Sequence, residues 1–464
     1  MTGTEPAITL GGMSPTERPT VYVETYGCQM NASDSELMLG TFAARGYTPV
    51  DRPDGADVIL VNTCAIREHA EQRVFGRLGE LKRHMARDTI LGVTGCMAQR
   101  LGADLLRRAP HVSLVVGPDG YRALPALVDG ARAGARAVDT AFHPDEHYED
   151  VRPRRAAGVK AWIPVQRGCD YRCTYCIVPT TRGPERSRRL ADVVQEVRDA
   201  VAAGMTEVVL LGQTVNSYHD GTADFAALLR AVGAVPGLRR LRFTSPHPND
   251  FSTRVLAAMA DTAAVCEHVH LPMQSGSTRT LRRMLRRYTR EEYLRCVDRL
   301  RTAIPGLALT TDVIVGFPGE TDEDFQETLS AVDVVGFDDA YTFKFSPRAG
   351  TPATRLPAEE TVPDDVASGR LTELIAAVRR RGRARNVQLL GTRHEVLVEK
   401  RARRGDELQA RTRDFKTVLL GPDAAAVGQY CTVALTGTTG STFTGVVVDS
   451  GAARRRTALP LAAG

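Results

Sequence analysis

The stretch RGCDYRCTYCIVPTTRGPERSR at residues 167–188 carries three cysteines, Cys169, Cys173 and Cys176, in the spacing CxxxCxxC. Three thiolates at this spacing can hold three irons of a four-iron cluster and leave the fourth iron open to another ligand. A structural zinc site would need four ligands, and no fourth Cys or His lies nearby at finger-like spacing. The stretch therefore favours an iron–sulfur cluster over a zinc site or buried structural cysteines. Its open iron could chelate the amino and carboxylate groups of S-adenosylmethionine (SAM).

Around this motif, short apolar strands alternate with helices. The expected strands lie at 163–166, 208–211, 241–244, 269–271, 308–315 and 340–345. Helices are expected between them, for example at 191–203 and at 278–288, where apolar residues recur at helical spacing. Six strand–helix units predict a partial (βα)6 barrel, and the active site of such barrels lies at the carboxyl ends of the strands.

Polar residues follow several of these predicted strands. We expect them to bind the carboxylate, ribose and adenine of SAM, and the glycines of the turn at 316–320 to let backbone approach the adenine closely. Any one of these residues is also compatible with a capping or turn role, and His247 in SPHP is equally compatible with a structural one. The candidates are Gln213, Asn216, Ser245, His247, Gln274, Ser275, Asp312 and Gly316.

Three other cysteines share one setting, because each directly follows a predicted strand. They are Cys28 in YGC, Cys64 in NTC and Cys96 in TGC. Alternating strands and helices in this region predict a parallel sheet, whose strand ends open on one edge where ligands bind. The three thiols should therefore converge without a local motif; the alternative is that they are small apolar core residues. The remaining cysteines, Cys266, Cys296 and Cys431, lack this context and are interpreted as structural.

The composition and pattern along the chain predict an α/β protein of several parts. These are a disordered leader at 1–18, an N-terminal parallel α/β domain at 19–141, a linker at 142–160, the barrel domain at 161–386, a small all-β module at 387–452 and a tail at 453–464. In the N-terminal domain, Ser33 and Glu36 predict a capping box that opens the first helix.

The net charge of +5 is mild, but the basic residues are unevenly placed. From Val387 to the end there are eleven Lys and Arg against seven Asp and Glu, which makes a polyanion plausible there. Truncation before Val387 should therefore weaken RNA binding more than SAM cleavage. Two basic groups could contact RNA phosphates or form solvated faces: Arg279, Arg282, Arg283, Arg286, Arg287 and Arg290 on the 278–288 helix, and Lys400–Arg404, Arg411, Arg413 and Lys416.

Nothing in the sequence resembles a signal peptide or a membrane-spanning segment. The nine cysteines are odd in number and unevenly spaced, which favours metal ligation in a reducing compartment over a disulfide framework. We therefore expect a cytoplasmic protein with no membrane partner.

Together these stretches resemble the radical SAM methylthiotransferases. The resemblance covers residues 20–450 and is also carried by HLPMQSGS at 270–277, IVGFPGET at 314–321 and FKFSPRAGTPA at 343–353. NTCAIREHAEQRVFGRLG at 62–79 is similar to the branch that modifies N6-dimethylallyladenosine in tRNA, rather than the branch that acts on a ribosomal protein. Met273 stands where the family pattern has Val, and SPHP where it has SHP; neither difference puts the chemistry in doubt.

The resemblance implies two [4Fe-4S] clusters. Cys28, Cys64 and Cys96 match the ligands of an auxiliary cluster, and Cys169, Cys173 and Cys176 match those of the SAM-binding cluster. One SAM would methylate sulfur at the auxiliary cluster, and another would yield the radical that removes hydrogen from C2 of the adenine at position 37, next to the anticodon. No catalytic side chain is assigned, because the cofactors carry this chemistry.

The resemblance also implies partners. These are the anticodon stem-loop of tRNA, bound in part by a C-terminal TRAM domain, an electron donor such as flavodoxin or ferredoxin, and a sulfur source; the protein would be a monomer. Two other functions stay open. One is a sibling activity on threonylcarbamoyl-adenosine in tRNA or on a ribosomal-protein aspartate. The other, a non-catalytic iron–sulfur RNA-binding protein, is disfavoured by the intact CxxxCxxC and the polar strand ends.

Overall fold

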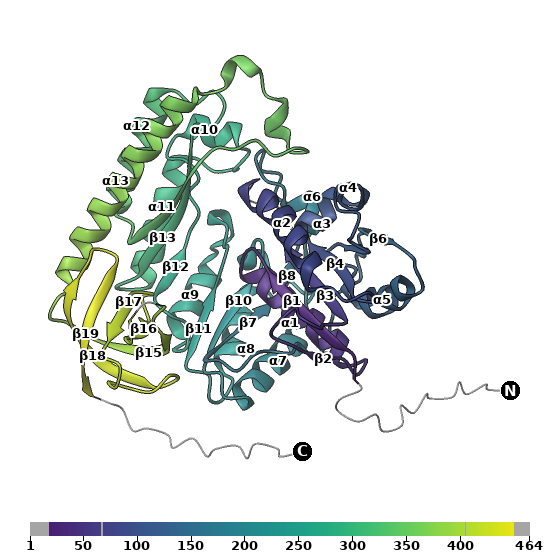
Figure 1. The fold of residues 1–464 in the computed structure, drawn as a ribbon. Helices are drawn as coiled ribbons and strands as arrows, with labels where there is room; N and C mark the ends of the chain where they lie inside the picture. Colours follow the sequence, from purple (N-terminus) through teal and green to yellow (C-terminus); the bar gives the residue numbers. More distant parts are fainter. Residues whose placement is uncertain (1–17, 66–67, 404, 450–464) are drawn as a thin grey trace. The chain divides into compact units, whose positions relative to one another are not determined.

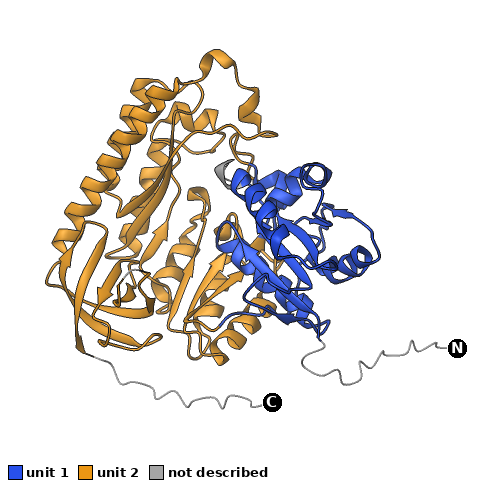
Figure 2. Cartoon of the chain, viewed as in Figure 1, with its two compact units in different colours: residues 1–156, 167–170, 177–186 blue, residues 157–166, 171–176, 187–464 orange. Residues whose placement is uncertain are grey.

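The computed structural model describes residues 18–65, 68–403 and 405–449. The chain forms two compact units (Figure 2). The first unit comprises residues 1–156, 167–170 and 177–186, and the second comprises residues 157–166, 171–176 and 187–464. The predicted leader, apart from Arg18, and the predicted tail lie outside the described residues. Within these described ranges, no helix has both the length and the apolar composition needed to cross a membrane.

The first unit is built on a parallel sheet, as predicted. The sheet has six strands in the order β2-β1-β3-β4-β5-β6 (Figure 1). The strands are β1 (Thr20–Thr25), β2 (Thr48–Pro49), β3 (Val58–Thr63), β4 (Ile90–Gly95), β5 (Leu114–Val116) and β6 (Ala137–Asp139). β3 and β4 are buried along their whole length. Continuous apolar strands of this kind are typical of a parallel sheet that is covered on both faces.

Helices cover both faces of this sheet. They are α1 (Gln29–Ala43), α2 (Glu68–Leu81), α3 (Cys96–Leu101), α4 (Ala103–Arg108) and α5 (Leu124–Arg132), and a further helix, α6 (Val178–Arg182), lies against α3. Side chains of α1 and α5 pack with Val58 and Leu60 of β3 in one core. Side chains of α2, α3 and α4 pack with Ile59 and Val61 in a second core. Alternate residues of one strand therefore face the two cores, as strand geometry requires.

The predicted capping box at the start of the first helix is wrong. α1 begins at Gln29, with Cys28 as its N-cap and Asn31 completing the box. Ser33 lies buried inside the helix. The earlier start follows from Gly27, whose φ of 137° turns the chain directly into the helix.

The second unit contains six parallel strands in two three-stranded sheets, β11-β10-β7 and β12-β13-β14. The strands are β7 (Lys160–Pro164), β10 (Glu207–Leu211), β11 (Arg240–Phe243), β12 (His268–His270), β13 (Ala308–Val315) and β14 (Asp339–Lys344). A parallel bridge between Leu241 and Val265 extends the first sheet towards the second. These are the six strands predicted for a partial barrel, and one continuous apolar core fills the space between them and their helices.

Helices alternate with these strands, as expected for such a barrel. They are α7 (Leu190–Ala202), α8 (Phe225–Gly233), α9 (Thr253–Asp261), α10 (Thr278–Arg283), α11 (Arg290–Ala303), α12 (Asp322–Val335) and α13 (Asp364–Gln388). α13 packs along α12 and β14 (Figure 1). Two short strands, β8 (Gln166–Arg167) and β9 (Arg186–Ser187), pair with each other near the cysteine motif.

The helix predicted at 278–288 is wrong in its second half. α10 ends at Arg283, and Leu285 and Arg287 have left-handed φ values of 55° and 57°. The backbone N–H of Arg286 donates to the carbonyl of Leu281 and closes the turn. Arg286 and Tyr288 become buried as a result, at 7% and 4% exposure. Tertiary packing here overrides a helical sequence pattern.

The predicted all-β module is a closed five-stranded barrel in the order β15-β16-β17-β19-β18. Its strands are β15 (Arg393–Arg401), β16 (Leu408–Thr412), β17 (Thr417–Leu420), β18 (Tyr430–Thr438) and β19 (Thr442–Asp449). Alternate residues such as Val396, Val398 and Phe443 fill its interior. This β-barrel belongs to the second unit.

Candidate functional site

The three N-terminal cysteines lie at the carboxyl ends of adjacent strands. Cys28 follows β1 as the N-cap of α1, Cys64 directly follows β3, and Cys96 opens α3 after β4. The strands are parallel neighbours, so these three ends lie side by side. Burial raises the pKa of the Cys96 thiol, and the adjacent charge of Arg182 opposes this rise.

Glycines set the backbone directions around these thiols. A Cβ added at Gly27 would lie 2.8 Å from Cβ of Cys64. A Cβ added at Gly95 would overlap the carbonyl oxygen of Thr63, and the φ of 90° at Gly95 also disfavours side chains. The glycines in YGC and TGC are therefore required by the close approach of the strand ends.

A buried charge cluster lies beside Cys96 and was missed by the sequence reasoning. Asp34 is fully buried and pairs with Arg167 at 2.9 Å and with Arg182 at 2.8 Å. The Nε of Arg182 donates to Sγ of Cys96 at 3.2 Å. Burial alone would lower the pKa of Arg182, but Asp34 and Cys96 raise it well above its usual value.

In the second unit, the loop with Cys173 and Cys176 is tied to the turn that follows α10. The N–H of Cys176 donates to the carbonyl of Cys173 at 3.0 Å. Thr174 lies between them and forms two bonds of 3.0 Å to this turn, from its N–H to the carbonyl of Met284 and from its hydroxyl to the carbonyl of Arg283. In the first unit, the N–H of Cys169 donates to the carbonyl of Gly183 at 3.1 Å.

The turn after α10 places Arg286 against this loop. Its Nη1 donates to Sγ of Cys173 at 3.4 Å, and its Nε donates to the hydroxyl of Tyr288 at 3.0 Å. Its Nη2 donates to the carbonyl of Pro272 at 3.4 Å. Sequence reasoning placed this arginine on a solvent-facing helix, so its position beside a cysteine is a correction.

Among the predicted SAM residues, Gln213 and Asn216 follow β10. The side-chain oxygen of Gln166, a residue missed from sequence, accepts from the backbone N–H groups of Gln213 and Thr214 at 2.9 and 3.2 Å. The carboxamide of Asn216 is engaged with the backbone of His247: it donates to the carbonyl at 2.9 Å and accepts from the N–H at 2.7 Å. The side chain of Asn216 thus holds the loop after β11 in place.

His247 is a packed, neutral histidine. It is 2% exposed, and its ring stacks on Tyr171 with centroids 3.9 Å apart. Burial, followed by the charges of Arg286 and Arg287, lowers the pKa of His247 to about 2. Its Nε2 is buried and has no hydrogen-bond partner within the described part of the chain.

Ser245 and Gln274 both have left-handed backbones, with φ values of 58° and 69°. Such values are uncommon outside glycine and persist only where the surroundings hold them. The backbone of Gln274 is held by β13. Its N–H donates to the backbone carbonyl of Asp312, and its carbonyl accepts from the N–H of Ile314, both at 2.8 Å. Ser275 is fully buried and lies 3.3 Å from the hydroxyl of Thr328.

Within β13, Asp312 is paired with His270 at 3.2 Å. The other ring nitrogen of His270 lies 2.9 Å from the hydroxyl of Thr310. On the adjacent strand β14, Tyr341 and Phe343 are 60% and 38% exposed, and the Tyr341 ring meets His270 edge-on at 5.8 Å. Exposed aromatic faces beside paired polar groups are well suited to an unstacked nucleobase.

The turn that begins at Gly316 is held from inside the protein. The N–H of Gly316 donates to the carboxylate of Glu320 at 2.9 Å, and Arg370 pairs with the same carboxylate at 2.8 Å. Gly316 has a φ of 72°, and a Cβ there would lie 2.7 Å from Cβ of Ala367. Glycine is therefore needed for packing against α13 whether or not a ligand binds.

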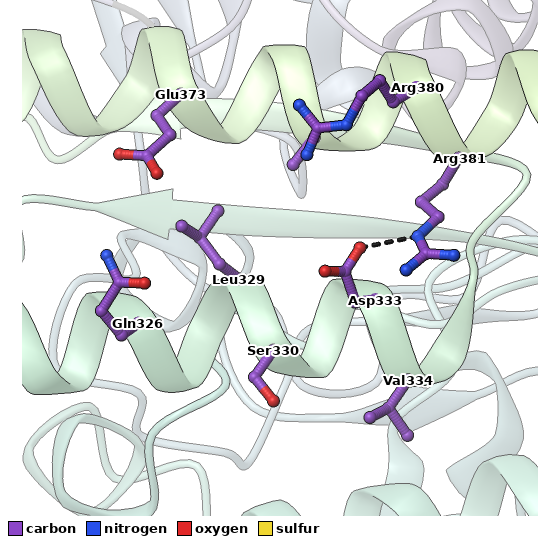
Figure 3. A pocket seen from close by; sticks show the side chains of 9 residues that line it. Gln326, Leu329, Ser330, Asp333, Val334, Glu373, Arg380 and Arg381 are labelled. Atoms are coloured by element: carbon purple, nitrogen blue, oxygen red, sulfur yellow. Dashed lines mark hydrogen bonds and ion pairs between the residues drawn. The ribbon is translucent and has the colours of Figure 1, made fainter.

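Among the described residues, no three His, Cys, Asp or Glu side chains are grouped as ligands of a single metal ion. A hollow between α12 and α13 is lined by none of the predicted cysteine or SAM residues (Figure 3). Its wall includes an ion pair of 2.6 Å between Asp333 and Arg381, each about half exposed. An exposed pair of this kind indicates a solvated surface.

The predicted basic helix face is largely committed to internal contacts. Arg279 pairs with Asp324, and Arg283 pairs with Glu360. Arg290 donates to the hydroxyl of Ser330 at 3.0 Å and to the carbonyl of Gly276 at 3.3 Å. Arg279, Arg282 and Arg287 are the exposed members of this group, and Arg279 is engaged with Asp324.

Three of the predicted phosphate-binding residues in the β-barrel also form internal contacts. Arg413 pairs with Glu267 at 2.7 Å, Lys416 pairs with Asp338 at 2.6 Å, and Arg411 pairs with Glu399 at 3.1 Å. The carboxylates Glu267 and Asp338 belong to the (βα)6 part of the unit. Arg413 and Lys416 therefore join the β-barrel to the (βα)6 part of the unit, whereas Arg411 pairs with Glu399 inside the β-barrel.

Two arginines of β11 also bond to the β-barrel and complete its interface with the (βα)6 part of the unit. Arg240 is fully buried and donates to the carbonyl of Arg411 at 2.7 Å, and Arg242 donates to the carbonyls of Thr412 and Arg413, both at 2.8 Å. The basic residues of the 400–404 segment that stay exposed are Lys400, Arg401 and Arg403, whereas Arg404 lies outside the described residues.

Comparisons with known proteins agree with this architecture. Residues 20–117 match the "Uncharacterized protein family UPF0004", and residues 163–332 match the "Radical SAM superfamily". The tRNA-2-methylthio-N(6)-dimethylallyladenosine synthase of Solibacter usitatus is 44% identical over 90% of this chain and 95% of its own. The protein of the same name from Geobacter sulfurreducens is 42% identical over 95% of this chain and 100% of its own.

Solved structures share the fold at low identity. The radical SAM methyltransferase TsrM from Kitasatospora setae aligns with a TM-score of 0.58 and 17% identity, over 75% of this chain and 76% of TsrM. The cobalamin-dependent SAM radical enzyme OxsB aligns with a TM-score of 0.53 and 14% identity, over 80% of this chain and 61% of OxsB. Identities this low support the fold alone.

Proposed function

This chain belongs to the family of tRNA-2-methylthio-N(6)-dimethylallyladenosine synthases, and we propose that it converts N6-dimethylallyladenosine at position 37 of tRNA to its 2-methylthio derivative. The observation that carries the proposal is 42–44% identity to such enzymes over about nine-tenths of the chain. The two cysteine sets, at strand ends in one unit and in a CxxxCxxC loop, support the same reaction.

We assign Cys28, Cys64 and Cys96 to an auxiliary [4Fe-4S] cluster, and Cys169, Cys173 and Cys176 to the cluster that binds SAM. When bound, these clusters and SAM supply the sulfur and radical chemistry. The residues fit anionic clusters, because a buried guanidinium contacts one thiol of each set: Arg182 contacts Cys96, and Arg286 contacts Cys173. A buried charge is costly unless an opposite charge accompanies it.

The chain itself supplies positioning. We keep Gln213, Ser245, Gln274, Asp312 and Gly316 as candidates for contact with SAM, through backbone groups wherever the side chain is engaged. Asn216 and His247 are better suited to hold the loop after β11, because Asn216 bonds to the backbone of His247. Tyr341 and Phe343 offer exposed aromatic faces for a base splayed out of the anticodon loop.

The finer parts of this function are proposals as well. They are the division into the domains predicted from sequence, the identity of the β-barrel as an RNA-binding TRAM domain, the anticodon stem-loop as its ligand, a flavodoxin or ferredoxin as electron donor, a separate sulfur source and a monomeric state. The closed five-stranded barrel with its exposed basic segment supports the TRAM assignment.

Deleting the gene should remove 2-methylthio-N6-dimethylallyladenosine from the organism's tRNA and leave N6-dimethylallyladenosine in its place. The reason is that the chain is proposed to act on C2 after the dimethylallyl group is present. Mass analysis of tRNA nucleosides from the deletion strain, with a complemented strain as control, measures both species. Loss of the methylthio form of threonylcarbamoyl-adenosine, or of methylthiolation on a ribosomal-protein aspartate, would identify a sibling activity instead.

Replacing Lys400, Arg401 and Arg403 together with Gln should weaken tRNA binding and make it less sensitive to salt. Each phosphate contact releases counterions, so the slope of log affinity against log salt should fall in magnitude by about two to three. Fluorescence anisotropy with labelled tRNA across a salt series measures the slope. The point variants replace truncation as the test, because truncation before Val387 would leave the buried Arg240 without its acceptor, the carbonyl of Arg411.

A matched control is available in the first unit, where Lys82, Arg83 and Arg87 are exposed and have the same composition. Their triple Gln variant should bind tRNA with the slope of the parent protein. An unchanged slope in the Lys400, Arg401 and Arg403 variant would show that the segment is merely solvated.

A further inference from the structure

Each cysteine set is contacted by one buried arginine. Arg182 is 3% exposed and donates to Sγ of Cys96 at 3.2 Å, within the first unit. Arg286 is 7% exposed and donates to Sγ of Cys173 at 3.4 Å, within the second unit. Hydrogen bonds of this kind to cluster sulfurs, together with net charge and solvent exposure, set the reduction potential of an iron–sulfur cluster.

Among the described residues, the cluster around Asp34 holds two buried arginines and one carboxylate. Arg167 and Arg182 share a single carboxylate, that of Asp34, and all three side chains are at most 5% exposed. One Nη of Arg182 is buried and has no hydrogen-bond partner among the residues that the structure describes. The arrangement therefore has room for a further negative charge beside Cys96.

In the described part of the second unit, Arg286 is likewise a buried positive charge without a carboxylate to neutralise it. Within the described ranges, no carboxylate forms an ion pair with Arg286; its donors go to a thiol, a phenol and a carbonyl. The neighbouring carboxyl of Asp250 accepts from the hydroxyl of Tyr171 at 3.1 Å instead. An unpaired guanidinium at this depth is unfavourable unless an anion completes the site.

The backbone around Arg286 is strained in a way that serves this contact. Leu285 and Arg287, on either side of it, are both left-handed, a conformation that is unfavourable for residues other than glycine. Hydrogen bonds from Thr174 to the carbonyls of Arg283 and Met284 fix the turn to the cysteine loop. The fold therefore holds an unfavourable turn that delivers a positive charge to Cys173.

We propose that Arg182 and Arg286 are dedicated counter-charges, one for each cluster, and that each raises the reduction potential of its own cluster. The inference rests on the proposed assignment of the two cysteine sets. Reduction adds a negative charge to a cluster, so an adjacent guanidinium favours the reduced form. Both arginines are positioning residues, because they act through the cluster ligands. The two contacts are independent, so each arginine should affect one cluster only.

The test uses full-length protein in two backgrounds that each keep one cluster. Cys28, Cys64 and Cys96 are replaced with Ala in one background, and Cys169, Cys173 and Cys176 in the other. Arg182→Gln and Arg286→Gln are then introduced separately, and the remaining cluster is titrated by potentiometry with electron paramagnetic resonance detection. Arg107→Gln and Arg282→Gln, at exposed arginines of the first and second units, are the controls.

We expect Arg182→Gln to lower the ratio of reduced to oxidised auxiliary cluster at fixed potential by at least tenfold, or about 59 mV for one electron. It should leave the SAM-binding cluster unchanged, and Arg286→Gln should show the converse. Arg182→Lys and Arg286→Lys keep the charge and should restore most of the ratio. A merely structural role would instead make Lys and Gln equivalent, or change iron content without changing the potential.

The failure of this inference can be separated from the failure of the cluster assignment. If a background without the arginine changes assembles no cluster, the cysteine assignment is wrong and this inference falls with it. If both backgrounds assemble clusters and the Gln variants leave the potentials at the control values, only the counter-charge role is refuted. If a Gln variant loses its cluster, the matching Lys variant is measured instead. A tenfold fall in the ratio of reduced to oxidised cluster in that Lys variant would also refute the counter-charge role.

Discussion

Replacing Cys169, Cys173 and Cys176 with Ala is expected to abolish the formation of 5′-deoxyadenosine from SAM. The reason is that these thiolates are proposed to hold the cluster with the open iron, and the auxiliary set alone offers no site where SAM can be chelated and reduced. Iron should fall from roughly eight to roughly four per chain in anaerobically prepared protein. Iron analysis and chromatography of the SAM cleavage products under reducing conditions measure the two effects.

The chain offers a matched control for this experiment. Cys266, Cys296 and Cys431 are also buried, at 2%, 6% and 3% exposure, and are interpreted as structural. Their triple Ala variant should keep both the iron and the cleavage of SAM. Residual 5′-deoxyadenosine from the variant of the CxxxCxxC motif would show that the radical chemistry has been assigned to the wrong cysteines.

Replacing Cys28, Cys64 and Cys96 with Ala should separate the two halves of the reaction. This variant should lose about half of its iron, continue to cleave SAM reductively, and form no methylthio product on tRNA. The physical reason is that the sulfur site and the SAM-cleaving site use different thiols on different parts of the chain. Iron analysis, 5′-deoxyadenosine formation and nucleoside mass analysis measure the three outcomes on one preparation.

The contradicting outcomes are specific. Loss of all iron would mean that the two sets do not form independent sites. Full methylthiolation by this variant would mean that the strand-end cysteines are core residues rather than ligands. Far-ultraviolet circular dichroism of the variant, compared with the parent protein, identifies a variant that has not folded.

The parallel sheet of the first unit and the position of cysteines at its strand ends were accessible from sequence because they depend on local patterns. Apolar runs such as 58–62 and 90–93 mark strands, and parallel strands bring the residues that follow them to one edge. Cys64 and Cys96 lie there for this reason. The six barrel strands were accessible on the same grounds, to within a few residues.

The roles of the arginines were not accessible from sequence. Helical spacing at 278–288 predicted an exposed arginine face that contacts RNA or is solvated. The helix instead ends at Arg283, because burial of Arg286 and Tyr288 outweighs the local preference. Arg182 and Asp34 are far apart in the chain, and nothing local indicates that they form a pair. Long-range electrostatic contacts of this kind leave no periodic signal in a single sequence.

The predicted SAM residues were only partly accessible, for a related reason. Sequence places polar residues at strand ends but does not say which of their groups are already used. The carboxamide of Asn216 forms hydrogen bonds to the backbone of His247, and Ser275 is buried against Thr328. Gln166 and His270 contribute to the same region from positions that carry no turn or capping signal.

The buried contacts between β11 and the C-terminal β-barrel limit how this protein could be recombined with its relatives. Arg240 and Arg242 reach backbone carbonyls of the β-barrel, while Arg413 and Lys416 reach carboxylates in the other direction. A chimera with the β-barrel of another protein would leave buried charged side chains without partners on both sides of the junction, unless those partners were transferred as well. The β-barrel is therefore not expected to be exchangeable on its own, and substitutions at its interface with the (βα)6 strands should occur together on both sides.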